Sequence, residues 1–388
     1  MIDECSLEWD ESTACGWIHY KKKKNMKRIL CIIIALYGFY VNPALAQYSQ
    51  CDSVDFCSLV NMVETNYSGF PTKVNKQTQP YYDQLKQRLY NSVCKENRPG
   101  YEAAAEYVAW FEDYHLSVGG SISEAYMKPR VKYDSIKYAP RFISLPVDEN
   151  TYLIRIPSFA FEDSIVSFVE NAVNEYKESG KENLIIDIRG NGGGLDYTFT
   201  PLVKLIYNRP FKLDGAEFRA TSDIARFLRG AYESQNGQPS WALAVADSID
   251  TGRYEFVPIP GVRETISLDT INIFPRRVAV VIDNNNASSA EQFILFAKSC
   301  SDRVAIYGKD NTLGAYDYSN LMSYDLPCSK KTCKIPTSRT IGISEDNPGI
   351  DLIGIAPDVT IPLPYPSEIT DNIDLWIRWI AEDLVSRL

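Results

Sequence analysis

The sequence of 388 residues predicts an α/β domain with a mostly parallel sheet, preceded by a helical segment. From residue 152 onward, strand and helix patterns alternate along the chain. The predicted strand 183–188 is a continuous apolar run, as strands buried on both faces are. Before residue 119 the apolar residues instead recur at helical spacing.

The N-terminal part is expected to form two helices. Apolar residues at three- and four-residue steps predict one helix over 81–93 and a second over 101–111. Stretches containing glycine and proline at 69–71 and 97–100 supply the breaks. We expect residues 47–118 to make a helical N-terminal subdomain.

The rest of the chain, 119–388, is expected to be the α/β domain. Residues 210–270 are polar, rich in aromatic side chains and poorly periodic, which indicates an insertion bordering the cleft. The predicted strands are 152–156, 183–188 and 277–283, and the predicted helices are 163–179, a segment through 202–206, and 290–300.

The chain begins with the pattern of a cleavable signal peptide over residues 1–46. A basic stretch at 20–28 precedes an apolar run at 29–41, and Ala44-Leu45-Ala46 then predicts cleavage before Gln47. The apolar run is shorter than the roughly 20 residues of a transmembrane helix. Met26 is an alternative start, in which case residues 1–25 are not translated. We expect a soluble exported protein, periplasmic or extracellular, with no membrane insertion after processing.

Six of the nine cysteines follow the predicted cleavage site, and an even number in an oxidising compartment permits disulfides. Two short-range pairs are candidates, Cys328 with Cys333 and Cys51 with Cys57. For Cys94 and Cys300 the sequence leaves pairing and a free buried thiol equally open.

The composition argues against several classes of partner. The net charge of −10 disfavours nucleic acid, because neutralising phosphates requires a basic face. The chain has no pair of cysteines at zinc-finger spacing, and we expect no metal site.

The chain contains only two histidines, and His19 lies inside the predicted signal peptide. His115 is therefore the one imidazole of the expected mature protein. The segment 287–291, with the sequence ASSAE, has the setting of a nucleophilic serine, and such a serine needs a base near neutral pH.

Two strand-turn-helix junctions are expected to bring backbone N–H groups to one point. At the first, Gly192 and Gly193 have no side chain to block a carbonyl oxygen. At the second, the N–H of Ser289 would lie beside Ser288. Donors from two junctions form an oxyanion hole, although the glycine run taken alone predicts only a sharp turn.

Three ordered motifs carry a resemblance to a known family. Residues 184–194 (LIIDIRGNGGG), 287–291 (ASSAE) and 354–358 (GIAPD) resemble the signature elements of the carboxyl-terminal processing, or tail-specific, serine peptidases, which include the tricorn core protease. The resemblance spans about 152–364. The spacing of the second motif selects Ser288 as the nucleophile, three residues before Glu291. The alternative is that Ser288 only caps the following helix.

The resemblance also bears on the base. Members with a serine-lysine dyad carry lysine directly after a Thr-x-Gly segment, and here Ala315 follows Thr312-Leu-Gly. The tricorn-like branch instead takes a histidine from an Asp-x-His segment, which Asp113-Tyr-His115 resembles. Lys309 is the alternative base, and an interaction of His115 with helix-terminal carbonyl groups is the alternative role for the histidine.

An imidazole base also needs an orienting group. In tricorn-like members a serine before the histidine relays to a carboxylate shortly before the last motif. Tyr114 stands in the place of that serine, and Asp351 stands in the place of the carboxylate. Asp351 is therefore our first choice of orienting group, Glu345 our second and Asp113 our third.

The resemblance implies a crotonase/ClpP-like spiral fold with a helical N-terminal subdomain, and a serine peptidase acting on proteins or peptides without a cofactor. The space between 118 and 152 is too short for a PDZ domain. Two rivals share the fold. One is a member that binds a ligand or peptide but has lost hydrolysis. The other is a crotonase-type acyl-transfer or hydratase enzyme, which would need an anchor for coenzyme A that the sequence does not supply.

Overall fold

The computed structural model describes residues 43–120, 136–160, 162–235, 237 and 239–386, with side chains described from 51 onward. By its contacts the chain divides into Met1–Pro43 and Ala44–Leu388. Every feature reported below belongs to the second unit. The predicted signal peptide lies outside the described residues, except that the first helix already begins at Pro43. No helix among the described residues is long and apolar enough to span a membrane.

Four helices open the described chain; one contains the predicted helix 81–93, and another covers the predicted helix 101–111 except for its last two residues. The longer two, α1 and α3, end where glycine, proline or asparagine interrupts the pattern; the residue after α3, Asn97, adopts a left-handed conformation (φ 56°) that stops the helix. The four helices are α1 (Pro43–Asn66), α2 (Phe70–Lys73), α3 (Gln79–Glu96) and α4 (Gly100–Ala109).

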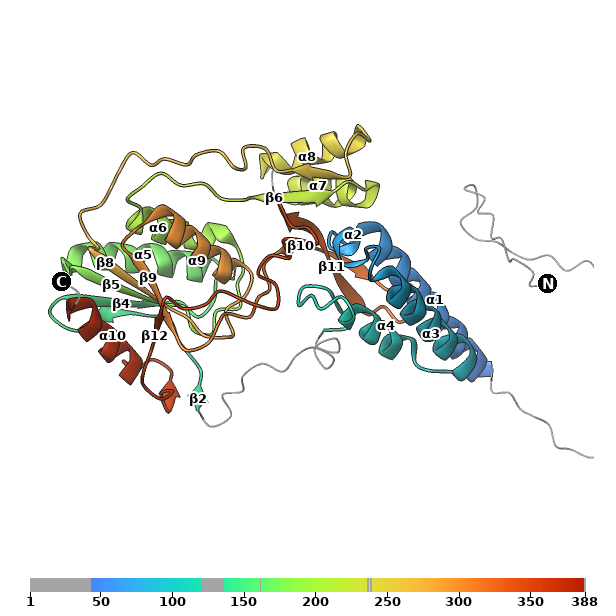
Figure 1. Cartoon of the computed structure of the whole chain (residues 1–388), viewed down its shortest axis with the longest axis horizontal. Helices are drawn as coiled ribbons and strands as arrows, with labels where there is room; N and C mark the ends of the chain where they lie inside the picture. The colour runs from blue at the N-terminus through green and yellow to red at the C-terminus, as the bar shows by residue number, and fades with distance from the viewer. Residues whose placement is uncertain (1–42, 121–135, 161, 236, 238, 387–388) are drawn as a thin grey trace, which may run out of the picture. The chain divides into compact units, whose positions relative to one another are not determined.

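A six-stranded sheet follows, in the order β12-β9-β8-β5-β4-β3 (Figure 1). All neighbouring pairs are parallel except β3 with β4. The central strands β4, β5 and most of β8 are buried, which explains their continuous apolar sequences. The strands are β3 (Ile143–Pro146), β4 (Thr151–Arg155), β5 (Asn183–Asp187), β8 (Arg277–Val281), β9 (Val304–Gly308) and β12 (Val359–Thr360).

Helices cover both faces of this sheet. On one face, side chains of α5, α6 and α9 pack on Ile154, Ile186 and Val280. On the other, α10 packs on alternate residues of the same strands, such as Leu153 and Ile185. The helices are α5 (Asp163–Ser179), α6 (Asp196–Ile206), α9 (Ser289–Cys300) and α10 (Leu375–Ser386).

A second, antiparallel sheet has the order β1-β11-β6-β7, with β10 also paired to β11. Residues of α1, α3 and α4 share one core with β10 and β11. A short parallel pair, β13 with β2, stands apart from both sheets. The strands are β1 (Ser117–Val118), β2 (Lys137–Tyr138), β6 (Ala216–Arg219), β7 (Phe256–Pro258), β10 (Tyr318–Asp325), β11 (Thr332–Thr340) and β13 (Glu368–Ile369).

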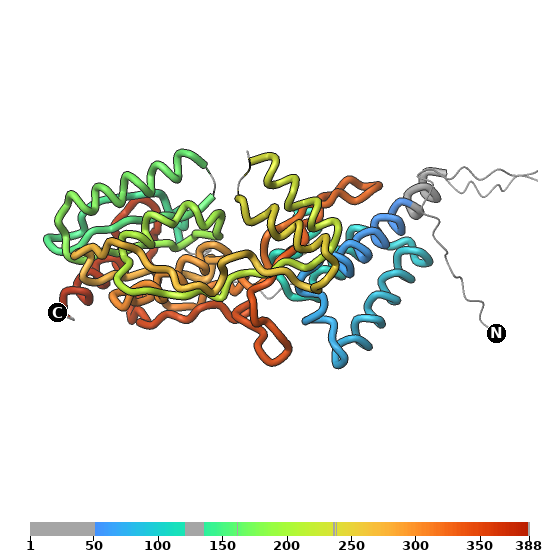
Figure 2. Tube along the Cα trace, turned by 90° about the horizontal axis from the view of Figure 1, so that it is seen from above, coloured from blue at the N-terminus to red at the C-terminus, as the bar shows by residue number. Residues whose placement is uncertain are grey.

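The region predicted as an irregular insertion is more ordered than its sequence indicates. Between β6 and β7 the chain forms two helices, α7 (Ser222–Ser234) and α8 (Ser240–Asp250), which run side by side in Figures 1 and 2. They bury a small core of their own that includes Leu228 and Val245. Apolar residues recur at helical spacing in α7, at Ile224, Phe227 and Leu228, although the sequence around them was predicted as irregular.

Both predicted short-range disulfides are wrong, because the cysteines pair at long range. Cys51 of α1 is bonded to Cys328, which follows β10, with 5.5 Å between their Cα atoms. Asp55, one turn further along α1, accepts the N–H groups of Cys328 and Ser329, at 2.8 Å each. The sequence gives no sign that α1 lies against this turn. Cys333 instead points into the core and is free, as are Cys57, Cys94 and Cys300.

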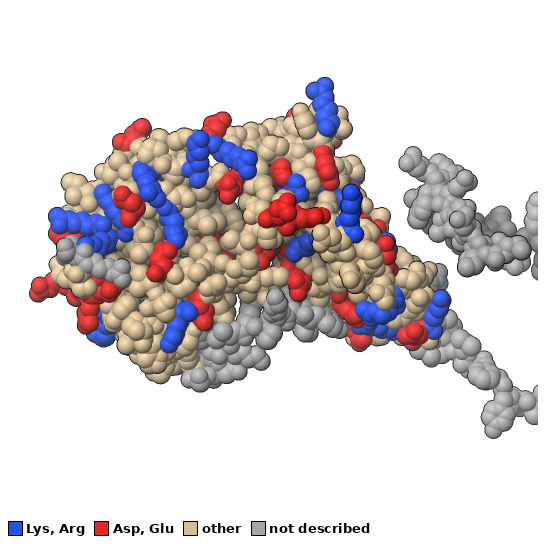
Figure 3. Space-filling view, viewed as in Figure 1, with Lys and Arg blue, Asp and Glu red and all other residues tan. Residues whose placement is uncertain are grey.

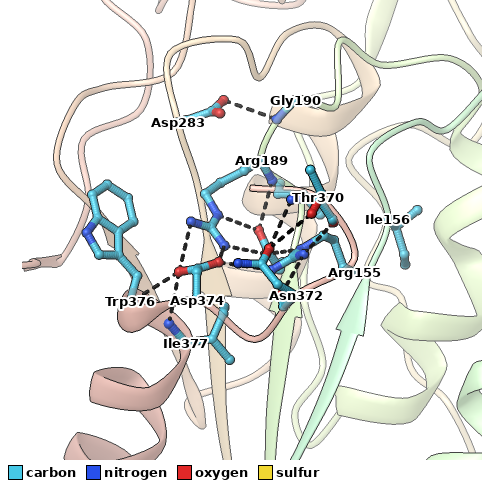
Figure 4. A network of polar contacts seen from close by, with 12 residues as sticks. Arg155, Ile156, Arg189, Gly190, Asp283, Thr370, Asn372, Asp374, Trp376 and Ile377 are labelled. Atoms are coloured by element: carbon cyan, nitrogen blue, oxygen red, sulfur yellow. Dashed lines mark hydrogen bonds and ion pairs between the residues drawn. The ribbon is translucent and has the colours of Figure 1, made fainter. Parts of the chain in front are cut away.

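A buried network of alternating charges joins the C-terminal helix to the sheet (Figure 4). Asp187 at the end of β5 lies between Arg155 and Arg189, at 2.6 and 2.7 Å. Asp374, just before α10, pairs with the same two arginines, at 3.1 and 2.7 Å. The two guanidinium groups outweigh burial and lower the pKa of Asp187 below its ordinary value. Each buried charge therefore has partners of opposite sign.

Charged side chains are mixed on the exposed surface. Figure 3 shows lysine and arginine interspersed with aspartate and glutamate on the face in view, with no broad basic patch.

Candidate active site

The two predicted strand-turn-helix junctions lie side by side and are bonded to each other. Strands β5 and β8 are neighbours, and each continues into a turn before its helix. The buried Asn286, in the second turn, donates through its amide to the carbonyl oxygens of Ile188 and Asn191 in the first. Because both turns are fixed by one side chain, the residues that follow them are held in register.

Ser288 occupies the N-cap position of α9, but with a backbone that a capping residue does not ordinarily adopt. Its φ is 56° and its ψ is −123°, whereas an N-cap is usually extended. A non-glycine residue in such a region costs on the order of 1–3 kcal/mol and persists only when its surroundings hold it. Here the Ser288 N–H donates to the carbonyl oxygen of Ala315 at 2.9 Å and to Glu291 at 3.2 Å.

Glu291 is the group that fastens this turn to the segment 312–315. Its carboxylate is fully buried and also accepts the Thr312 hydroxyl at 2.5 Å and the N–H groups of Gly314 and Ala315 at 2.8 and 2.9 Å. Burial raises the pKa of Glu291, and these hydrogen bonds oppose the shift. The glutamate of the serine motif therefore has a structural role, because it holds the backbone of Ser288.

The glycine turn lies directly against the serine. A Cβ added to Gly193 would be 2.8 Å from the Ser288 Cβ and 3.0 Å from the Ser289 nitrogen, so only glycine fits there. The Gly193 N–H, however, donates to the Asn191 side chain at 2.9 Å. Among the described residues, the N–H groups of Gly192 and Ser289 have no hydrogen-bond acceptor. Both are available as donors at the junction.

The two adjacent serines have different surroundings. The Ser289 hydroxyl donates to the carbonyl oxygen of Gly194 at 2.7 Å, and the residue is buried. Ser288 is only partly buried. The hydroxyl of Ser289 is thus committed to the turn, which favours Ser288 as the reactive group.

The position that holds lysine in serine-lysine members lies next to Ser288. Ala315, 2% exposed, accepts the Ser288 N–H, and its methyl group offers no base. Lys309 is engaged elsewhere, since its ammonium donates to the carbonyl oxygen of Leu363 at 2.9 Å and lies over the Tyr365 ring.

His115 lies between α4 and β1, in a short segment held by Asp113. The buried Asp113 carboxylate accepts the backbone N–H of His115 at 2.8 Å and the hydroxyl of Tyr67, which follows α1, at 2.7 Å. The Nδ1 atom of His115 is buried and has no hydrogen-bond partner among the described residues. A buried imidazole nitrogen without a partner is costly and calls for an explanation.

Asp351 also has a buried atom without a hydrogen-bond partner among the described residues. Its Oδ1 accepts the N–H groups of Tyr316 and Asp317 at 2.8 Å each, whereas its buried Oδ2 has no partner among the described residues. Burial raises the pKa of Asp351 well above its ordinary value, and the negative charges of Asp113 and Asp317 add to the shift. The first-choice orienting group is therefore a buried carboxylate near Asp113.

These contacts link the predicted residues without a direct bond between serine and histidine. The Ser288 N–H donates to Ala315, and the N–H of the next residue, Tyr316, donates to the Asp351 carboxylate. The negative charge of Asp113 raises the pKa of Asp351, and the Asp113 carboxylate accepts the backbone N–H of His115. In the described part of the chain, no hydrogen bond joins Ser288 Oγ to His115. Such contacts are often loose before substrate binds.

The other two carboxylates considered as orienting groups differ from each other. Glu345 is exposed in the loop after β11 and makes no ion pair or side-chain hydrogen bond among the described residues. Asp113 is buried beside the histidine, but both of its oxygens already accept hydrogen bonds.

Two residues of this site could not have been found by motif. Tyr67 follows a helix far away in sequence, and the role of its hydroxyl depends on how that end of α1 packs against β10. Asp317 accepts the N–H groups of Ile350 and Asp351 and so shapes the loop that carries Asp351. Among the described residues no group of three or more side chains is arranged to hold a metal ion.

The comparisons with known proteins identify the family of this chain. The profile of peptidase family S41 matches residues 150–361, more than half of the chain. The chain belongs to peptidase family S41. The match contains Ser288, the glycine turn and Asp351, whereas His115 and Tyr67 precede it. Membership supports a serine protease function.

Solved structures show the same fold at low sequence identity. Mature CPAF, solved in complex with lactacystin, is 14% identical with a TM-score of 0.58, over 88% of this chain and 98% of that one. A candidate peptidase from Parabacteroides merdae is 16% identical with a TM-score of 0.52, over 80% and 89% of the two chains. No curated protein matches the sequence.

Proposed function

We propose that this S41 family member is an exported serine peptidase that hydrolyses peptide bonds of proteins or peptides, with Ser288 as nucleophile and His115 as general base. The observation that carries the proposal is the backbone of Ser288. A strained serine at the start of a helix, held by Glu291 in a capping box and followed by the free N–H of Ser289, supports a role in attack beside its role as a cap.

In the proposed reaction Ser288 Oγ attacks the carbonyl carbon while His115 accepts the hydroxyl proton. The N–H groups of Ser289 and Gly192 then stabilise the oxyanion, and Gly193 would contribute only after releasing Asn191. When the tetrahedral intermediate collapses, His115 returns the proton to the leaving amine. Water hydrolyses the acyl-enzyme by the same steps. No cofactor takes part.

The choice of His115 rests on the surroundings of the competing bases. Ala315 occupies the lysine position beside Ser288, and Lys309 is bound to Leu363. His115 Nδ1 and Asp351 Oδ2 are both buried and without a partner among the described residues, and Asp113 interacts with both residues. We assign Asp351 as the group that orients the imidazole and stabilises its positive charge during attack.

The remaining assignments rest on the sequence. The signal-peptide pattern supports export to the periplasm or the exterior, and the resemblance to tail-specific peptidases supports a crotonase/ClpP-like spiral fold for the catalytic part. A non-hydrolytic binding protein is the alternative. It is favoured by the engaged Gly193 N–H and by the lack of a bond between Ser288 and His115 among the described residues.

An active-site-directed fluorophosphonate tests the proposal. Purified protein should gain one adduct by intact mass, and peptide mapping should place it on Ser288. Ser288→Ala should remove the labelling, whereas Ser289→Ala, in which the neighbouring hydroxyl is lost, should keep it. No adduct on folded wild-type protein, or one that remains in Ser288→Ala, would overturn the assignment in favour of a binding protein or another nucleophile.

A further inference from the structure

Two free cysteines stand on facing helices of the N-terminal part, outside the candidate active site. Cys57 is exposed on α1 and Cys94 is exposed near the end of α3. Neither takes part in the Cys51–Cys328 disulfide. The other two free cysteines, Cys300 and Cys333, are buried in separate cores.

The two helices are antiparallel, and side-chain hydrogen bonds between them set their register. Glu64, near the end of α1, accepts the Tyr82 hydroxyl at 2.6 Å and the Lys86 ammonium at 2.7 Å, both from α3. Cys57 precedes Glu64 by seven residues, about 10 Å along the helix. Cys94 follows Lys86 by eight residues, about 12 Å in the opposite sense. The two thiols are therefore at nearly the same level.

The same faces of the two helices line one groove. On α1 it is bordered by Cys57, Val60 and Glu64, and on α3 by Lys86 and Tyr90, all at three- and four-residue spacing. Cys94 lies one turn beyond Tyr90 on the same side of α3. Both thiols therefore lie on the groove side of their helices and at nearly the same height along the helix pair.

The ionisation of the groups in the groove reflects this proximity. The pKa of the Cys57 thiol is raised by burial and then by Cys94. The pKa of the Tyr90 phenol is raised by Cys94 first and by Cys57 after it. The Cys57 thiol and the Tyr90 phenol therefore both lie near Cys94.

We propose that Cys57 and Cys94 are a disulfide-forming pair that joins α1 to α3. In an oxidising compartment a low-molecular-weight disulfide such as glutathione disulfide supplies the oxidant. One cysteine thiolate attacks it and releases one glutathione thiol. The second cysteine thiolate then attacks the mixed disulfide and releases the other. Two protein thiols are oxidised and one glutathione disulfide is reduced.

The bond would close a loop of about 37 residues that contains α2 and most of α3. Cross-linking such a loop restricts the unfolded chain, so the oxidised protein should melt at a temperature higher by roughly 5–10 °C than a variant without the bond. The test needs no peptidase activity, and its failure would leave the proposed function untouched.

The experiment incubates purified wild-type protein with glutathione disulfide, alkylates the remaining thiols after denaturation, and maps the peptides without reduction. We expect a peptide that joins Cys57 to Cys94, with only Cys300 and Cys333 alkylated. Cys57→Ser, Cys94→Ser and the double variant keep Cys51–Cys328, and all three should melt at one common, lower temperature. Alkylation of both Cys57 and Cys94, separate glutathione adducts, or a bond between two chains would overturn the proposal.

Discussion

The backbone N–H of Ser288 donates to the carbonyl oxygen of Ala315 at 2.9 Å, so the residue after the Thr-x-Gly segment lies beside the proposed nucleophile. In serine-lysine peptidases that residue is the base. Here that residue is Ala315, whose methyl group cannot accept a proton, so the base must come from another part of the chain. The helical N-terminal part, which carries His115, therefore becomes part of the proposed catalytic machinery.

Gly193→Ala should lower kcat/KM by about 100-fold or more, because the new methyl group would contact Ser288 Cβ and the Ser289 nitrogen in a backbone conformation (φ 102°) that alanine avoids. Gly230→Ala, in α7 and outside the candidate active site, is the matched control, since its Cβ would meet no atom within 4 Å. Steady-state kinetics on a peptide substrate measure both. Equal losses in the two variants would show that the close approach at Gly193 is unimportant.

Glu291→Gln should destabilise the protein by about 1–3 kcal/mol and reduce fluorophosphonate labelling. The introduced amide cannot accept all four hydrogen bonds that the carboxylate receives, and its NH₂ group would face backbone N–H donors. Urea unfolding provides the free energy. Glu345→Gln, at an exposed position, should change it by less than about 0.5 kcal/mol. Wild-type stability and labelling in Glu291→Gln would contradict the proposed anchoring of Ser288.

Asp351→Asn should raise stability at neutral pH while lowering activity. The pKa of Asp351 in the folded state lies well above its ordinary value of 3.8, so between these two pH values the folded protein holds a proton on Asp351 that the unfolded protein has lost. The free energy of unfolding therefore falls as pH rises from about 4 through the raised pKa. Asparagine removes this pH dependence.

Melting temperatures across pH test the effect of Asp351→Asn. The variant should melt above wild type at pH 8, and the difference should shrink toward pH 4. Asp346→Asn, exposed in a nearby loop, should follow wild type throughout. A variant that is less stable than wild type at every pH would mean that the Asp351 carboxylate is held for structure alone.

Tyr67→Phe should cost about 1–3 kcal/mol of stability and lower kcat with little change in KM, because the buried Asp113 loses one hydrogen-bond donor and the His115 segment loosens. Tyr81→Phe, 68% exposed, is the control. The positioning role is separated from plain stability by a double-mutant cycle. In a His115→Ala background, Tyr67→Phe should cause no further loss of activity, and an additive loss would argue against it.

Much of the sheet domain was predictable because its signals are local. The apolar strand over 183–187, the glycine turn and the helix over 289–300 follow from periodicity and residue type, and α5 has the predicted bounds. Helix α7 was missed although its apolar residues Ile224, Phe227 and Leu228 recur at helical spacing.

In the candidate site, too, residues within motifs could be predicted, whereas contacts between distant segments could not. Ser288, the glycine turn and Asp351 lie in motifs, so their positions could be predicted from residue types and spacing. The contacts that decide their behaviour join distant segments, namely Tyr67 with Asp113, Asp317 with the Asp351 loop, and Cys51 with Cys328. The periodicity of the sequence does not predict that α1 packs against β10 and β11. Both predicted disulfides were therefore wrong, and Tyr67 was missed.

The most direct test of the central claim compares the rate of fluorophosphonate labelling at Ser288 in His115→Ala and Lys309→Ala. Removing a general base typically costs about 10²- to 10⁴-fold, so the histidine variant should label at least about 100-fold more slowly than wild type. The lysine variant should label at the wild-type rate. Wild-type labelling in His115→Ala together with a large loss in Lys309→Ala would contradict the assignment of His115 as the base.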